Sequence, residues 1–150
     1  MTGRFLGVDL GTKRIGLALA ASDTGVVSPL RVLEAHSDVQ ANARSILAVA
    51  DEYDVTGIVV GLPLNMDGTE GPQAKLSRKL ADQLQQMTAT ANPTGERALD
   101  IHLHDERLTS HAADGRLIER DLTRKKKKAR QDAVAAQVLL ESFLKSGHRA

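Results

Sequence analysis

The sequence of 150 residues contains no cysteine and no tryptophan, and it has only one tyrosine and two phenylalanines. The absence of cysteine excludes disulfides, zinc sites built on thiolates and cysteine nucleophiles. The scarcity of aromatic side chains excludes the stacking platforms on which single-strand binders hold unpaired bases. If the protein binds nucleic acid, we therefore expect it to contact the backbone and to recognise shape.

Long hydrophobic runs are also missing, since no apolar stretch approaches the ~20 residues that a membrane span requires. The chain reaches a charged, strand-like segment within a few residues of Met1, without the pattern of a signal peptide. A chain of this length forms one domain with a core of its own. We expect one domain over residues 1–150 in a cytoplasmic protein with no membrane partner, as a monomer or homodimer.

Positive charge is concentrated in one segment. Residues 124–130 carry six positive charges, so a chain of net charge +1 leaves about −5 on everything else. Such a run buries little surface, and we predict a mobile loop. The loop either contacts a polyanion or is only a solvated segment, which is the commoner case for runs of charge.

The first third of the chain has the pattern of three strands. Residues 4–10 are an apolar run interrupted by Asp9, and residues 14–21 alternate large with small apolar side chains. Residues 26–35 are rich in β-formers but contain Pro29, which favours an edge strand. We predict an antiparallel meander with the strand of Asp9 on its inner side.

The remainder alternates helices with strands. Helical spacing predicts helices over 39–53 and 72–91, a short helix from Thr109 or Ser110 to Asp121, and a last helix over 131–145. The β-branched run 55–61 predicts a strand buried on both faces, and the alternating run 99–104 predicts another strand. The order β-β-β-α-β-α-β-α-α indicates an α/β fold with one mixed five-stranded sheet flanked by helices.

Carboxylates follow the ends of the predicted parallel strands. Asp9 ends the first strand and Glu106 follows the fifth, while the loop 61–71 follows the fourth. Because ligands gather at the carboxyl ends of parallel strands, we expect these features to face one crevice. Asp132, in the first turn of the predicted last helix, has the spacing to reach the same place.

Each of these residues also has a purely structural interpretation. Asp9 would cap the turn at 10–13, and Asp132 would oppose the dipole of its helix. Asp105 and Glu106 would pair with Arg107 in a solvated turn. The glycines of the loop 61–71 would be plain turn residues. The convergence of carboxylates from three elements favours a functional site.

Oxygen ligands without cysteine or histidine-rich spacing select Mg²⁺ or Mn²⁺ over zinc. Carboxylates that hold two such ions are suited to phosphodiester hydrolysis. We expect substrate contacts from Lys13, Arg14, Asn65 and Arg107, and from Lys125, Lys126, Lys127 and Lys128. Whether Asp105 joins the metal ligands is left open.

Five segments together resemble one protein family, in the same order along nearly the whole chain. They are residues 8–11 (VDLG), 14–18 (RIGLA), 59–68 (VVGLPLNMDG), 105–109 (DERLT) and 132–140 (DAVAAQVLL). In these the chain resembles the YqgF family, also called RuvX, bacterial proteins described as Holliday junction resolvases or pre-16S rRNA nucleases.

The resemblance implies an RNase H-like fold with Asp9, Glu106 and Asp132 as catalytic, metal-binding carboxylates. It implies Mg²⁺ or Mn²⁺ as cofactor and cleavage of structured nucleic acid, most directly maturation of the 5′ end of pre-16S rRNA. The ribosomal small subunit would then be a partner. Resolution of branched DNA in recombination is the alternative activity.

Two other functions fit parts of the pattern. A phosphate-binding turn like residues 9–12 also occurs in actin-like ATPases, but those clamp ATP between two such domains and this chain is long enough for one. A non-catalytic RNA-binding assembly factor would keep the fold and the basic segment, but it would not need all three carboxylates. ATP binding and RNA cleavage, respectively, distinguish these from a nuclease.

Overall fold

A computed structural model describes residues 3–21, 23–91, 99–108 and 124–146, apart from the side chains of 108 and 124–131. The described elements, in chain order, are β1 (Arg4–Leu10), β2 (Arg14–Ala21), β3 (Val27–Glu34), α1 (Val39–Glu52), β4 (Gly57–Leu62), α2 (Pro72–Ala91), β5 (Asp100–Asp105), the 3₁₀ turn η1 (Glu106–Leu108) and α4 (Arg124–Lys145). The predicted helix from Thr109 or Ser110 to Asp121 lies outside the described residues.

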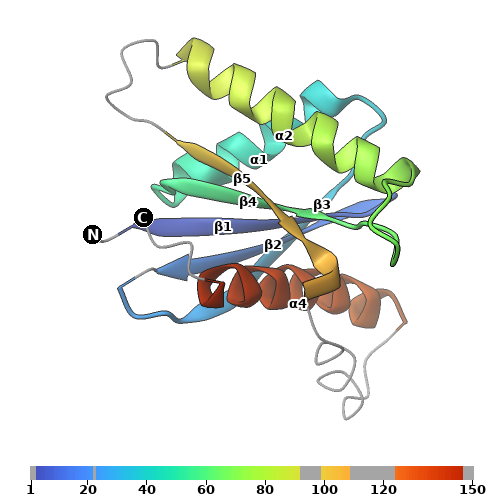
Figure 1. Cartoon of the computed structure of the whole chain (residues 1–150). Helices are drawn as coiled ribbons and strands as arrows, with labels where there is room; N and C mark the ends of the chain where they lie inside the picture. The colour runs from blue at the N-terminus through green and yellow to red at the C-terminus, as the bar shows by residue number, and fades with distance from the viewer. Residues whose placement is uncertain (1–2, 22, 92–98, 109–123, 147–150) are drawn as a thin grey trace.

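The five strands form one mixed sheet in the order β3-β2-β1-β4-β5 (Figure 1). The first three strands pair antiparallel as a meander, and β4 and β5 run parallel to β1. This confirms the predicted fold class, the inner place of β1 and the edge place of β3. Parallel pairing brings the carboxyl ends of β1, β4 and β5 to one edge.

Helices cover both faces of the sheet: α1 and α2 lie on one face and α4 on the other (Figure 1). The face under α1 and α2 holds the larger hydrophobic core, in which large aliphatic side chains interlock. Its buried members include Leu6, Val8, Ile15, Leu17, Ile46, Ile58, Val60, Leu80 and Leu84. The alternation of strand side chains therefore places Asp9, between Val8 and Leu10, on the face of α4.

The face under α4 carries small residues on β2, beside the larger Phe5 and Val59. Its buried cluster contains Ala18 and Ala20 of β2 together with Ala136, Leu140 and Phe143 of α4. A side chain added at Gly7 of β1 would lie only 3.0 Å from a backbone carbonyl of α4. Small residues on both partners let the helix backbone approach the sheet closely.

Two predicted features of the last helix were wrong. The helix begins at Arg124, not near Gln131, so the basic run forms its first turns and is not a loop. Lys, Arg and Ala are good helix formers, and extending a helix that is already packed further on costs little. Asp132 is consequently about two turns inside the helix, where the dipole of the first turn no longer explains it.

None of the helices in the described part of the chain has the length and apolarity needed to cross a membrane. This finding agrees with the hydropathy pattern of the sequence.

The close contact between α4 and β2 makes a stability prediction. A methyl group added at Gly16 would overlap the backbone of Asp132, so Gly16→Ala must displace α4 and should cost about 1–3 kcal/mol of unfolding free energy. Gly71→Ala is the control, because the nearest atom to its added carbon is 3.6 Å away. Thermal unfolding of both variants tests this. Equal melting temperatures would contradict the packing described here.

Candidate functional site

The candidate site is centred on Asp9, near the end of the inner strand β1. Two glycines flank it on the neighbouring strands. Gly16 of β2 pairs with Asp9 directly. On the other side the pairing of β1 with β4 ends at Val8 and Val60, so Gly61 follows at the level of Asp9. On either side of Asp9 the face under α4 therefore lacks a strand side chain.

Each gap is occupied by part of another acidic residue. A carbon added at Gly61 would lie 2.6 Å from Oε1 of Glu106, so the Glu106 carboxyl packs directly on this glycine. A carbon added at Gly16 would meet the backbone of Asp132. Glycine inside a strand commonly marks such a close approach by another group. The two glycines thus bring Glu106 and Asp132 to opposite sides of Asp9.

The carboxyl groups of Asp9 and Glu106 are hydrogen-bonded to each other. Burial raises the pKa of Glu106 to about 9, and the hydrogen bond to Asp9 and the charges of Asp9 and Asp105 act in the same direction. Burial also raises the pKa of Asp9, against the effect of the bond from Glu106, and the charge of Asp132 raises it further. At neutral pH Glu106 is therefore the protonated donor and Asp9 the acceptor.

Asp132 has a different partner. Its Oδ2 accepts a hydrogen bond from Nε of Arg14 at 2.9 Å, and both side chains are partly exposed, at 29% and 23%. Arg14 opens β2, two residues before Gly16. The charge of Asp132 thus raises the pKa of Asp9, but the carboxylate is bonded to the guanidinium of Arg14.

The carboxyl groups of Asp9, Glu106 and Asp132 offer oxygen atoms as metal ligands, which suits a hard divalent cation such as Mg²⁺ or Mn²⁺. The carboxyl groups of Asp9 and Glu106 already share one proton, and a bound cation would replace it. Among the residues that the structure describes, no group of three or more His, Asp or Glu side chains is arranged to hold a metal ion. The geometry therefore offers a pair of ligands with a third carboxylate nearby.

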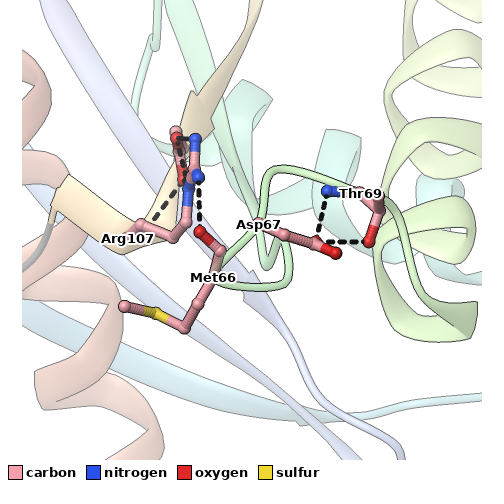
Figure 2. A network of polar contacts seen from close by, with 5 residues as sticks. Met66, Asp67, Thr69 and Arg107 are labelled. Atoms are coloured by element: carbon pink, nitrogen blue, oxygen red, sulfur yellow. Dashed lines mark hydrogen bonds and ion pairs between the residues drawn. The ribbon is translucent and has the colours of Figure 1, made fainter.

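Asp105 anchors Arg107. The guanidinium donates to both carboxylate oxygens, from Nε at 3.0 Å and Nη2 at 2.7 Å to Oδ2 and from Nε at 3.1 Å to Oδ1. The bond to Arg107 lowers the pKa of Asp105. Nη1 of Arg107 also donates to the carbonyl of Met66 at 3.3 Å, as Figure 2 shows. Arg107 therefore ties the turn that carries Glu106 to the loop after β4.

That loop is braced by its own side chains. Asp67 accepts from the backbone N–H of Thr69 at 3.0 Å and from its hydroxyl at 2.6 Å (Figure 2). Nδ2 of Asn65 donates to the hydroxyl of Thr69 at 2.9 Å. The amide of Asn65, which we predicted to bind substrate, is thus engaged within the loop, whereas the side chain of Met66 is 88% exposed.

The turn between β1 and β2 lies at the same edge. A backbone bond from the N–H of Gly11 to the carbonyl of Arg14, 2.8 Å long, closes it, and Lys13 is exposed there. Asp9 hydrogen-bonds to Glu106, which gives it a role beyond the turn cap considered above. Nε2 of Gln73, in the first turn of α2, holds the carbonyl of Leu10 at 2.7 Å.

Sequence reasoning identified the acidic residues but missed what positions them. Gly16 and Gln73 were not singled out, and Gly61 was considered only as the start of the loop 61–71. The signal for Gly61 was present, because a glycine inside a wholly apolar strand marks a close approach. The contact of Gln73 with β1 spans 63 positions in the sequence and leaves no local pattern. The side chains of Lys125, Lys126, Lys127 and Lys128 are outside the described set.

The model of the RuvX family, described as "Holliday junction resolvase", matches residues 3–146. The chain is 41% identical over 145 residues to a protein of Anaeromyxobacter sp. strain Fw109-5, covering 97% of this chain and 98% of the relative. It is 39% identical over 146 residues to a protein of Myxococcus xanthus, covering 97% and 89%. Both relatives bear the name "Putative pre-16S rRNA nuclease".

Solved structures share the fold at low sequence identity. The RuvC of Thermus thermophilus in complex with a Holliday junction substrate superposes with a TM-score of 0.54 at 13% identity, covering 97% of this chain and 96% of that one. The Holliday junction resolvase of fowlpox virus superposes with a TM-score of 0.57 at 14% identity, covering 95% and 98%. The expected fold and the expected family are both confirmed.

The raised pKa of Glu106 makes stability depend on pH. The folded protein holds this proton until about pH 9, while the unfolded chain releases it near 4.5. The stability that the proton contributes is complete below the lower value and is lost as the pH rises toward the higher one. Without metal, the melting temperature should fall over this range, and Glu106→Gln should flatten the fall because its amide stays neutral.

Melting curves in chelator across that range, with Glu34→Gln as an exposed control at the end of β3, test the prediction. If wild type and Glu106→Gln lost stability in parallel, Glu106 would not carry the proton.

Proposed function

Because the chain belongs to the RuvX family of Holliday junction resolvases, we propose that it is a metal-dependent nuclease that hydrolyses phosphodiester bonds in structured nucleic acid. The observation that carries the proposal is the hydrogen-bonded carboxyl pair of Asp9 and Glu106 beside Asp132. A protein does not gain stability by burying two acids in contact, since the desolvation of each is unfavourable. Such a pair is typical of sites where a cation binds.

We propose that Asp9, Glu106 and Asp132 hold Mg²⁺ or Mn²⁺ and are the catalytic residues. When bound, such an ion stabilises the charge that develops on a phosphate during hydrolysis and provides a nucleophile at neutral pH. The protein's part is positional: Gly16 and Gly61 clear the space around Asp9, and Arg107 fixes the turn of Glu106 through Asp105. Asp105 is committed to that arginine and is not assigned to the metal.

For the substrate, we propose the 5′ end of pre-16S rRNA, which would place the protein on the ribosomal small subunit in the cytoplasm. The names of the relatives support this choice. Branched DNA is the second candidate, supported by the description of the family and by the fold shared with two resolvases. Lys13, Arg14, Asn65 and Arg107 surround the same edge, where Lys13 is exposed for direct contact with phosphate.

The basic run is proposed as a phosphate clamp. Lys128 lies four residues before Asp132 on the same helix, so a rise of ~1.5 Å per residue puts the run about 6–10 Å along the axis from the site. Lysines act as point charges on phosphate and do not read base edges as fixed forks do. The run would thus contribute affinity without sequence preference.

Cleavage assays test the catalytic assignment. Asp9→Asn, Glu106→Gln and Asp132→Asn should each abolish Mg²⁺-dependent cleavage of labelled pre-16S RNA, of a four-way DNA junction, or of both, without lowering the melting temperature. Asp100→Asn, at the opposite end of the strand that precedes Glu106, is the matched control and should cleave normally. Persistent cleavage by the three variants would remove these residues from the chemistry.

Salt dependence tests the clamp. Replacing Lys125, Lys126, Lys127 and Lys128 with glutamine should weaken the binding of cognate and of scrambled RNA equally. It should also reduce the slope of log affinity against log salt concentration by up to ~3–4 units. Cleavage at saturating substrate should survive. An unchanged slope would mean that the run only extends the helix. A selective loss of binding to cognate RNA would mean that the run recognises the shape of the substrate.

A further inference from the structure

The ion pair between Arg14 and Asp132 joins two residues with separate proposed tasks. Arg14 is proposed to meet substrate, and Asp132 to bind metal, yet the two are hydrogen-bonded to each other at 2.9 Å. The contact links the first residue of β2 to α4 across 118 positions of sequence, so it belongs to the tertiary structure and not to a local turn. Its place beside Asp9 requires an explanation.

The pair occupies one oxygen of the third carboxylate. Asp132 is near enough to raise the pKa of Asp9, but its Oδ2 is occupied by Nε of Arg14. The described residues contain no group of three side chains arranged to hold a metal ion. A cation at Asp9 and Glu106 would have to compete with Arg14 for Asp132, because the guanidinium and the metal ion repel each other and both draw on the charge of one carboxylate.

The same pair is easily exchanged. Both side chains are partly exposed, and ion pairs of this kind contribute little to stability. Arg14 lies at the same edge of the sheet as Lys13 and the loop after β4. A phosphate of the substrate would approach the site from this edge. A guanidinium binds phosphate as well as it binds carboxylate. An incoming phosphate can therefore take Arg14 from Asp132.

Resting on the proposed function, we infer that Arg14 is a positioning residue that couples the binding of metal to the binding of nucleic acid. In the free protein Arg14 holds Asp132. In the complex Arg14 binds a phosphate of the substrate, and the released Asp132 joins Asp9 and Glu106 around the cation. Coupling of this kind is reciprocal, so metal must strengthen nucleic-acid binding by the factor by which nucleic acid strengthens metal binding.

Mn²⁺ titrations followed by electron paramagnetic resonance test the inference, with and without a four-way DNA junction at 4 °C, its integrity checked on a gel. Arg14→Gln frees Asp132 in advance, so without DNA it should bind Mn²⁺ about threefold to fivefold more tightly than the wild type. The further tightening caused by DNA should be smaller in this variant. Arg14→Lys keeps the charge and should behave like the wild type.

Arg31→Gln is the matched control. Arg31 lies on the edge strand β3 and forms an exposed ion pair with Glu52 at the end of α1, so its loss should change neither Mn²⁺ binding nor the effect of DNA. Arg14→Met serves as a second uncharged variant if the glutamine variant unfolds. Mn²⁺ binding that is no tighter in the uncharged variants, or an undiminished effect of DNA, would overturn the inference. If Asp9→Asn bound Mn²⁺ as the wild type does, the proposed function itself would fail, which is a separate outcome.

Discussion

The rest of the site depends on one contact, the hydrogen bond between the carboxyl groups of Asp9 and Glu106. Two half-buried acids in contact lose part of their hydration and repel each other when ionised, so the contact persists only with a proton or a cation between them. The neighbouring structure is arranged around this requirement. Gly61 gives Glu106 its place, and Gly16 lets α4 bring Asp132 alongside.

The two faces of the sheet divide stability from chemistry. Large aliphatic side chains under α1 and α2 supply most of the apolar core. The face under α4 carries glycine and alanine, which bury less apolar area per residue but allow the helix backbone to come close. A site that gathers acidic residues is unfavourable for the metal-free protein, and the core on the opposite face offsets that cost.

Most of the fold was predictable because each strand and helix carries its own period. The antiparallel meander, the edge place of β3 and the bounds of α2 follow from alternation, Pro29 and Pro72. The predicted start of α4 was wrong, because a charged run without an apolar face resembles a loop although its residues favour a helix. The pairing of Arg14 with Asp132, and of Asp105 with Arg107, depends on side-chain placement that residue spacing does not encode.

The position of a bound cation tests this account most directly. Crystals grown with Mn²⁺ and measured at its absorption edge would locate the ion by anomalous scattering. The account predicts a peak within coordination distance of the carboxylates of Asp9 and Glu106. A well-ordered metal-soaked crystal without a peak at these two carboxylates, or with Mn²⁺ bound only elsewhere, would contradict it.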